Sequence, residues 1–241
     1  MTLVGNKQCI LITGASRGLG YHLHQLYAER GWTTFPLVRR ESAAAGLRDA
    51  WGERCHPIVA DVSNDECMPK ITEVLYRHTQ HLNVVVNNAG IGGRTYTISD
   101  ITAGEVLDLL QAHCLGAIRC TQAVLPLLQA AKHAKIVNVT SRLGSMTKNA
   151  AGGFSDGQFS YSYRIAKAAQ NMFTLCLEQE LAKNGIAVYS VHPGRLLTGM
   201  AADDADTPPA VAASRFVSWL EAADDRASAH CISLEDGEVP W

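Results

Sequence analysis

The chain has 241 residues, of which 47% are hydrophobic and 18% are charged, and its formal net charge is -2. A chain of this length can form one α/β domain with a substantial core. The small net charge argues against a protein that binds the phosphate backbone of nucleic acids. Its apolar runs are too short for a membrane span, and the N-terminal segment is too short for a signal-peptide core. We therefore expect a cytoplasmic protein that binds neither nucleic acid nor membranes.

The seven cysteines stand at positions 9, 55, 67, 114, 120, 176 and 231, with no Cys-x-x-Cys pair and no Cys/His cluster. This spacing favours reduced thiols in a cytosolic protein and predicts no metal site. His22 and His24 lie close together in a helical pattern, and we assign both to the exposed side of that helix.

Short apolar segments alternate along the chain with amphipathic helical patterns. Most of these segments are apolar at consecutive positions, as expected for strands that are buried on both faces. The expected strands are 8–13, 33–38, 56–60, 82–87, 135–140, 186–191 and 230–234. The expected helices are 18–30, 42–51, 65–79, 102–131, 159–183 and 209–223, with Thr102 and Ser160 as candidate N-caps.

This alternation predicts a single-domain, Rossmann-like α/β fold over residues 1–241. About seven strands would form a doubly wound parallel sheet with helices on both faces. In such sheets a ligand binds beyond the carboxyl ends of the strands. The unusual polar clusters of this chain follow directly after expected strands, so we expect them to meet at that edge.

The first cluster is the glycine-rich loop Thr13-Gly14-Ala15-Ser16-Arg17-Gly18-Leu19-Gly20, between the first strand and the first helix. Gly14 permits a tight turn, Gly18 lets the backbone approach a pyrophosphate, and Gly20 permits close packing of the helix. The helix N-terminus offers free N–H groups to the anion. This placement favours a dinucleotide site over an ordinary glycine turn.

The residues after the second strand bear on which nucleotide binds. A carboxylate there would accept hydrogen bonds from the adenosine ribose of NAD, but Arg39 and Arg40 stand there instead, with Arg17 in the glycine loop. Guanidinium groups bind phosphates through paired, charge-assisted hydrogen bonds. We therefore predict NADP(H), the alternative being arginines that merely begin a helix. Asp61, followed by Val62 after the third strand, is placed to accept from the adenine amino group.

Tyr163 and Lys167 are spaced i, i+4, so on a helix both project from one face. A phenol has a pKa of about 10, and a fixed ammonium beside it lowers that pKa and makes a general acid/base near neutrality. The spacing is also common in helices where the tyrosine is packed and the lysine is solvated. The pair gains meaning from the other motifs of the chain.

Four motifs occur in order along nearly the whole chain: Thr13-Gly14-x-x-x-Gly18-x-Gly20, Asn87-Asn88-Ala89-Gly90, Tyr163-x-x-x-Lys167 and His192-Pro193-Gly194. In this combination the chain resembles the short-chain dehydrogenase/reductase family. Its C-terminal segment Gly237-Glu238-Val239-Pro240-Trp241 further resembles the branch of bacterial C-factor-like proteins and sniffer-type carbonyl reductases.

The resemblance implies that two further segments line the nucleotide cleft. After the fourth strand these residues are Asn88, Ala89 and Gly90, which would act through backbone contacts. After the sixth strand they are Pro193, Gly194, Leu196 and Thr198, which would enclose the nicotinamide carboxamide and the phosphates.

The resemblance also implies three catalytic roles. Ser141, at the end of the fifth strand, would hydrogen-bond the substrate oxygen. Tyr163 would supply or remove the proton, and Lys167 would lower the pKa of Tyr163 and hold the nicotinamide ribose. A homodimer or homotetramer is expected from the same resemblance, through the long helices 102–131 and 159–183.

The chain departs from the family at His113. Many members carry an asparagine there, in an Asn-x-x-Gly segment that helps to hold a water near the lysine, whereas this chain reads His113-Cys114-Leu115-Gly116. A histidine can donate and accept hydrogen bonds, so our hypothesis is that His113 takes part in the proton relay. The alternatives are a bulkier side chain that blocks the water and a core histidine bonded to a backbone carbonyl.

One further segment near the site differs from most relatives, and another has a distinctive composition. The interval from Ser141 to Tyr163 is longer, and its glycine-rich composition predicts a flexible substrate loop at 145–159. Phe154 and Phe159 within it would cover a substrate or pack against a neighbouring subunit. The acidic, alanine-rich segment 195–210 is typical of a mobile substrate lid.

The sequence therefore favours an NADPH-dependent reductase of a ketone or aldehyde, reversible as an alcohol dehydrogenase, with Tyr163 as the general acid/base. One alternative is a cofactor-bound signalling or interaction protein of the C-factor-like branch with little turnover. Another is an epimerase or dehydratase of the extended relatives, whose glycine loop is spaced differently and whose C-terminal region is larger.

Overall fold

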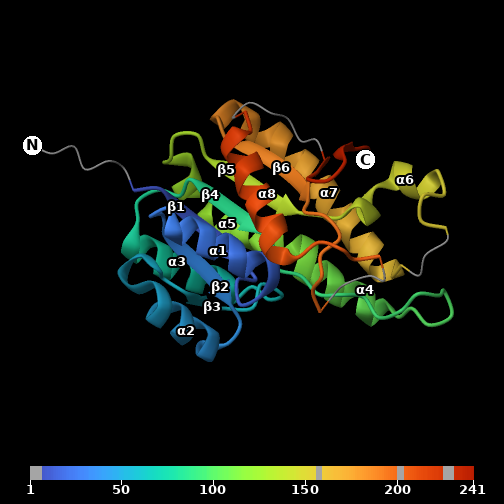
Figure 1. Cartoon of the computed structure of the whole chain (residues 1–241), viewed down its shortest axis with the longest axis horizontal. Helices are drawn as coiled ribbons and strands as arrows, with labels where there is room; N and C mark the ends of the chain where they lie inside the picture. Colours follow the sequence, from blue (N-terminus) through green and yellow to red (C-terminus); the bar gives the residue numbers. More distant parts are fainter. Residues whose placement is uncertain (1–6, 156–158, 200–203, 225–230) are drawn as a thin grey trace, which may run out of the picture.

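Eight strands form one sheet within the part of the chain that this computed structural model describes, residues 7–155, 159–199, 204–224 and 231–241 (Figure 1). Their order is β3-β2-β1-β4-β5-β6-β7-β8, and every pair of neighbours is parallel except β7 and β8. The strands are β1 Cys9–Thr13, β2 Thr33–Val38, β3 Ile58–Val59, β4 Val84–Asn87, β5 Lys135–Val139, β6 Ala187–His192, β7 Cys231–Ser233 and β8 Gly237–Val239.

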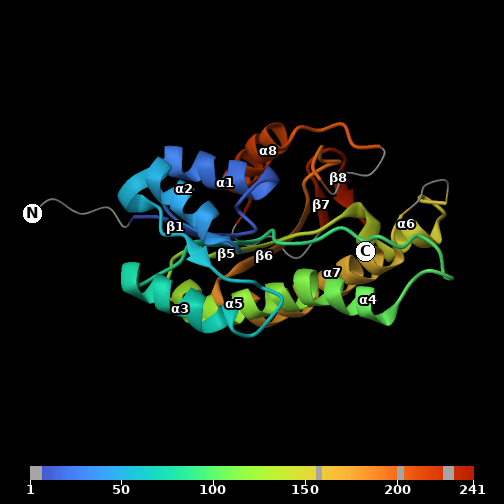
Figure 2. The same cartoon turned by 90° about the horizontal axis from the view of Figure 1, so that it is seen from below.

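Helices cover both faces of this sheet, as Figure 2 shows, with α1, α2 and α8 on one side and α3, α4, α5 and α7 on the other. Each face has its own hydrophobic core. In the central strand β1, Ile10 and Leu11 are both fully buried but belong to opposite cores, because successive side chains point to opposite faces. The predicted doubly wound α/β fold is thus confirmed.

The helices of the chain are α1 Gly18–Glu29, α2 Glu41–Trp51, α3 Cys67–His78, α4 Ala103–Leu110, α5 Gly116–Gln129, α6 Met146–Ala150, α7 Tyr161–Leu181 and α8 Pro209–Ala222. Thr102 and Ser160 cap α4 and α7 through their side-chain oxygens, as expected. None of the helices in the described ranges is long and apolar enough to cross a membrane.

The strand β8 is not among the predicted strands. It is three residues long and pairs antiparallel with β7 after a tight turn. Such a short segment carries no alternation of apolar and polar residues that sequence analysis can detect. The predicted strand 230–234 corresponds to β7, with residue 230 outside the described residues.

The predicted helix 102–131 is interrupted. Between α4 and α5 the chain forms a π-helical turn, η2, over Gln111–Leu115. A π-turn inserts an extra residue into a helix without changing its hydrophobic pattern much, so periodicity does not reveal it. The turn contains His113, the residue at which the chain departs from the family that it resembles.

The structure overturns one further expectation and adds detail to another. His24 is completely buried rather than exposed, with its ring edge to face with Trp51 at 5.6 Å and its Nε2 atom 3.9 Å from Cys55 Sγ. The segment 145–159, expected to be a flexible loop, contains the helix α6, whose first turn is capped by Ser145. Residues 156–158 of that segment lie outside the described residues.

Candidate active site

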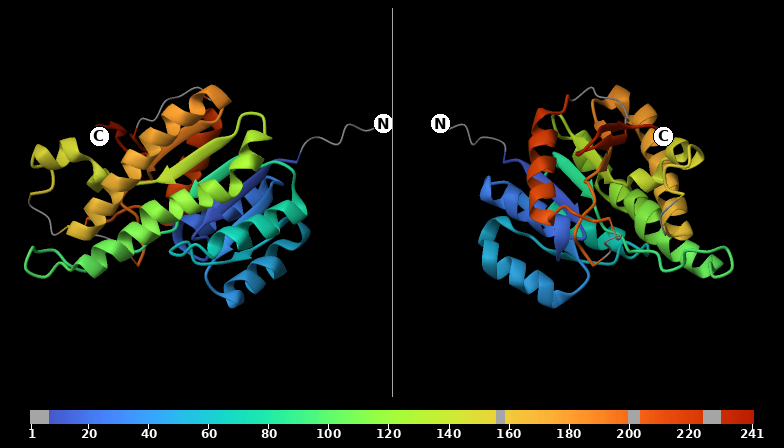
Figure 3. Two further views of the ribbon diagram at one scale, coloured as in Figure 1. Left: turned by 180° about the vertical axis from the view of Figure 1, so that it is seen from behind. Right: turned by 45° about the vertical axis from the view of Figure 1, so that its right-hand side comes forward.

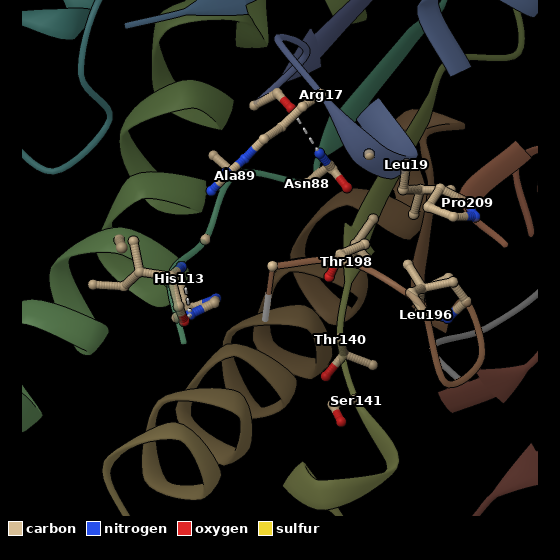
Figure 4. A pocket seen from close by; sticks show the side chains of 18 of the residues that line it. Arg17, Leu19, Asn88, Ala89, His113, Thr140, Ser141, Leu196, Thr198 and Pro209 are labelled. Atoms are coloured by element: carbon tan, nitrogen blue, oxygen red, sulfur yellow. Dashed lines mark hydrogen bonds between the residues drawn. The ribbon is translucent and has the colours of Figure 1, made fainter. Parts of the chain in front are cut away.

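A cavity of about 460 Å³ lies beyond the carboxyl ends of the parallel strands. In Figure 4, Arg17 and Asn88 lie toward one end of it, Thr140 and Ser141 lie toward the other, and Thr198 lies between them. The predicted site residues that line this cavity are Gly14, Ser16, Arg17, Gly18, Leu19, Arg39, Asp61, Val62, Asn88, Ala89, Gly90, His113, Ser141, Tyr163, Lys167, Pro193, Gly194, Leu196 and Thr198. The structure therefore gathers these residues around one space, whereas Gly20 and Arg40 do not line it.

The glycine loop has the shape that its sequence predicts. Gly14 and Gly18 have φ angles of 68° and 59°, which favour glycine. A Cβ atom on Gly14 would lie 2.9 Å from the Cα atom of Ala89, and one on Gly20 would lie 2.5 Å from the Asn88 side chain. The glycines let the loop, the helix α1 and the segment after β4 pack together, which leaves room for a phosphate group beside the helix N-terminus.

Thr13 and Asn88 hold the glycine loop against the segment after β4. The hydroxyl of Thr13 accepts hydrogen bonds from the backbone N–H groups of Asn88 and Ala89, each at 2.9 Å. The Asn88 side chain donates to the carbonyl oxygens of Thr13 at 2.9 Å and of Gly14 at 3.3 Å. Sequence analysis assigned Asn88 a backbone role only, whereas its side chain holds the glycine loop in place.

Two guanidinium groups lie at the nucleotide end of the cavity. Arg17 and Arg39 both line it and are exposed, and no carboxylate among the described residues pairs with either of them. Arg40 is exposed but does not line the cavity. Asp61 lines it as well, with its Oδ1 atom accepting from the backbone N–H of Ser63 at 2.9 Å. These residues fit a nucleotide that carries an additional phosphate.

At the other end of the cavity, Ser141 and Tyr163 are brought together from β5 and α7. Burial raises the pKa of Tyr163 to about 12, and a hydrogen bond with the Ser141 side chain opposes that rise. Ser141 is buried and its Oγ atom accepts from the backbone N–H of Leu143 at 3.2 Å. Two hydroxyl groups therefore lie side by side at this end of the cavity.

Lys167 lies close to the Tyr163 ring, with its Nζ atom 5.7 Å from the ring centroid. The ammonium donates to the carbonyl oxygen of Val139 at 2.7 Å and to Gln170 Oε1 at 2.9 Å. Burial lowers the pKa of Lys167 to about 7. In this structure burial is the first cause that acts on the pKa of Tyr163, and it raises that pKa. The expectation that Lys167, together with the cofactor, lowers the pKa of Tyr163 stays a prediction.

His113 is buried between α7 and the segment after β4. Its Nε2 atom lies 2.8 Å from the carbonyl oxygen of Ile91 and 3.2 Å from the Ile91 nitrogen, so the tautomer decides whether it donates or accepts. Its Nδ1 atom is buried without a partner among the described residues. Burial and the charge of Lys167 lower the pKa of His113 well below its usual value, so the imidazole is neutral.

Comparison with known proteins identifies the family of this chain. The family model for short chain dehydrogenases matches residues 8–209. The chain belongs to the short-chain dehydrogenase family. One relative is the C-signal protein of Myxococcus xanthus, which is 29% identical over 163 residues that cover 68% of this chain and 95% of the relative.

Solved structures of other short-chain dehydrogenases superpose on nearly the whole chain. The carbonyl reductase Sniffer of Drosophila melanogaster is 27% identical, with a TM-score of 0.85, and the match covers 98% of this chain and 100% of Sniffer. An NADPH-bound carbonyl reductase from chicken fatty liver is 24% identical, with a TM-score of 0.86 and the same coverage of both chains. The resemblance to the C-factor-like and sniffer branch is confirmed.

Two side chains at the substrate end of the cavity of this short-chain dehydrogenase were not among the predicted site residues. His192 lines the cavity, and both of its ring nitrogens are buried without a partner among the described residues. Arg142 also lines it, forms an ion pair with Asp204, and lies 5.6 Å from the centroid of the Phe154 ring. Their positions in the sequence could have indicated them, because Arg142 follows β5 and His192 is the last residue of β6.

The segment predicted as a lid is held by its own backbone. The carbonyl oxygen of Arg195 accepts from the N–H groups of Asp206 and Thr207, each at 3.0 Å, and Leu196 forms a β-bridge with Thr207. The Arg195 guanidinium also forms an ion pair with Asp206. Residues 200–203 of the predicted lid lie outside the described residues.

Proposed function

We propose that this short-chain dehydrogenase reduces a ketone or an aldehyde with NADPH, in a reversible reaction that uses Tyr163 as the general acid/base. The observation that carries this proposal is that Ser141, Tyr163 and Lys167 line the same cavity as the glycine loop and Arg39. One cavity therefore offers a place for a nucleotide and, next to it, hydroxyl groups for a carbonyl oxygen.

NADP(H) is the proposed cofactor because two exposed guanidinium groups, those of Arg17 and Arg39, face the nucleotide end without a carboxylate partner among the described residues. The NADPH-bound carbonyl reductase from chicken fatty liver, which has the same fold, supports this choice. When bound, NADPH supplies the hydride that reduces the substrate. Asp61 and Val62 would hold the adenine end, and Pro193, Gly194, Leu196 and Thr198 would enclose the nicotinamide end.

The side chains at the substrate end handle charge and protons. Negative charge develops on the carbonyl oxygen during reduction, and hydrogen-bond donors fixed in advance stabilise it. Ser141 donates one hydrogen bond, and Tyr163 donates a second and then transfers its proton. With its pKa raised to about 12, Tyr163 is protonated over the physiological pH range and is ready to act as the acid. Lys167, when charged, favours the phenolate that remains.

Two segments would complete the substrate side. We assign the substrate loop to 145–159, where the rings of Phe154 and Phe159 meet edge to face at 5.6 Å, and a lid to 195–210, which Asp204 links to Arg142. Of these, Phe159 and Asp204 line the cavity.

The proposed assembly is a homodimer or homotetramer, since Leu107 on α4 and Met172 on α7 are 59% and 60% exposed. The free cysteines support a cytoplasmic location.

A second candidate function is cofactor-dependent signalling or interaction with little turnover, because the chain is similar to the C-signal protein of Myxococcus xanthus. The presence of Ser141, Tyr163 and Lys167 in one cavity favours the enzyme. The two functions differ in whether NADPH is consumed, so the same assay decides between them.

The test is NADPH oxidation with a panel of ketones and aldehydes. Tyr163→Phe keeps the ring and removes the proton donor, so it should lower kcat at least about 100-fold. The matched control is Tyr161→Phe, which makes the same change on the same helix at a side chain that is 38% exposed, and it should keep wild-type activity. Tight NADPH binding with no oxidation by the wild-type protein would favour the signalling function.

A further inference from the structure

The carboxylate of Glu105 joins two segments that are distant in the sequence. Its Oε1 atom accepts from the backbone N–H groups of Arg94 at 2.7 Å and Thr95 at 3.3 Å, and its Oε2 atom accepts from the Thr95 hydroxyl at 2.7 Å. The Oε1 atom also accepts from the hydroxyl of Ser162 at 2.7 Å. Glu105 lies in the first turn of α4, and Ser162 lies in the first turn of α7. Figure 3 shows α4 and α7 close together.

The Ser162 hydroxyl continues this contact to the backbone of Tyr163. The Oγ atoms of Ser160 and Ser162 lie 2.8 Å apart, and the Ser160 Oγ atom accepts from the backbone N–H of Tyr163 at 3.3 Å. Because an ionised carboxylate can only accept, Ser162 donates to Glu105 and Ser160 must donate to Ser162. The hydrogen bonds therefore run in one direction, from the Tyr163 amide through Ser160 and Ser162 to Glu105.

These hydroxyl groups have little freedom to choose other partners. Ser162 is fully buried and Ser160 is 7% exposed. The backbone of Gly93 lies directly against them, since a Cβ atom there would be 1.9 Å from Ser160 Oγ. Hydrogen bonds from Arg94, Ser162 and Thr95 lower the pKa of Glu105 to about 2, although partial burial acts in the opposite sense. The carboxylate is therefore charged at any pH where the protein works.

Glu105 binds the cofactor segment, residues 88–95, which follows β4 and begins at the wall of the cavity. Gly90 lines the cavity, His113 contacts the backbone of Ile91, and Glu105 binds the backbone of Arg94 and Thr95. Residues of α4 and η2 therefore contact the cofactor segment at two places, at Ile91 and at Arg94–Thr95. Neither Glu105 nor Ser162 lines the cavity, so neither can touch the substrate or the cofactor directly.

We propose that Glu105 is a positioning residue, which fixes Tyr163 relative to the cofactor segment through Ser162 and Ser160. Tyr163 is the third residue of α7, and the first turn of a helix lacks intrahelical partners for its N–H groups. The Ser160 cap and the Glu105 carboxylate stabilise the first turn of α7, which would otherwise fray. This inference rests on the proposed role of Tyr163 as the acid.

The test compares Glu105→Gln and Ser162→Ala in the NADPH-bound protein. Each variant should lower kcat about tenfold, as expected for the loss of one charge-assisted hydrogen bond, and should leave the Kd of NADPH within about twofold. Because both residues act on one chain of hydrogen bonds, the double variant should lose little more than either single variant. Asp108→Asn, at an exposed carboxylate on the same helix, is the matched control and should behave as wild type.

Amide hydrogen exchange provides a readout that does not depend on turnover. In Glu105→Gln the first turn of α7 and residues 94–95 should exchange faster, while β1 and β5 keep their protection. If the wild-type protein does not oxidise NADPH, the proposed reaction fails and exchange alone decides the inference about Glu105. Unchanged exchange at the start of α7 would overturn the inference, and so would equal losses in kcat and in NADPH affinity.

Discussion

The ring of His113 meets the ring of Tyr163 edge to face, with their centroids 5.3 Å apart and their planes at 88°. Space for the imidazole exists because residue 90 is glycine, where a Cβ atom would lie 2.2 Å from the Cε1 atom of His113. The histidine thus packs against the proposed acid and against the cofactor segment at once. Its buried Nδ1 atom has no partner among the described residues, and such an atom is costly unless it binds water or a ligand.

This relationship predicts the effect of changing His113. If a water held at Nδ1 belongs to the proton relay, His113→Ala should lower kcat about tenfold and alter the pH profile. His113→Asn, which restores a hydrogen-bonding group of the type found in many relatives, should recover part of the activity. Truncation of a buried side chain also costs about 2–4 kcal/mol of stability, so rates are compared well below the melting temperature. Unchanged activity and an unchanged pH profile in His113→Ala would refute the relay.

The pKa of Lys167 predicts an alkaline loss of activity. Burial lowers this pKa to about 7, so the side chain is charged below that pH and neutral above it. Since the charged form is the one that favours the Tyr163 phenolate, kcat/KM for carbonyl reduction should fall as the pH rises through about 7. Lys167→Met should remove this pH dependence and lower kcat about 100-fold. Lys183→Met, at an exposed lysine, serves as the control. A wild-type rate that does not change between about pH 6 and pH 9 would contradict the assigned role of the Lys167 charge.

Arg39 predicts the preference for NADPH over NADH. Removing a guanidinium group from a phosphate costs about 1.5–3 kcal/mol, so Arg39→Ala should lower kcat/KM for NADPH about 10- to 100-fold. The value for NADH should change little, because NADH lacks the additional phosphate. Arg40→Ala changes the neighbouring exposed arginine, which does not line the cavity, and should keep the wild-type ratio. Equal losses with both nucleotides would show that Arg39 does not read the phosphate.

His24 predicts that the fold weakens in acid. Burial lowers the pKa of His24 to about 4 from 6.5. Between these values the unfolded chain binds a proton that the native state does not, so the free energy of unfolding falls as the pH drops from 6.5 to 4. The shift corresponds to at most about 3 kcal/mol. Urea unfolding of His24→Leu should show a smaller loss over this range than wild type, whereas His22→Leu should not. Parallel curves for His24→Leu and wild type would contradict this account.

The order of strands and helices was predictable because strands buried on both faces and amphipathic helices have different periods in the sequence. The start of α7 directly after Ser160 follows from the capping side chain of that residue. The π-turn at His113 and the burial of His24 were not predictable in this way. A π-turn barely disturbs helical periodicity, and the burial of His24 depends on Trp51 and Cys55, which only the folded chain brings beside it.

By itself the sequence determined the class of fold, the glycine loop and the identity of the proposed catalytic residues, because these depend on residue types at short, fixed spacings. Only the tertiary structure decided that Tyr163 is partly buried, that Lys167 is buried and that their pKa values move in opposite directions, since desolvation depends on everything packed around a group. Only the tertiary structure, too, brought Glu105 to Ser162. No local pattern in the chain records that contact, because it joins α4 to α7 across the surface where the two helices pack.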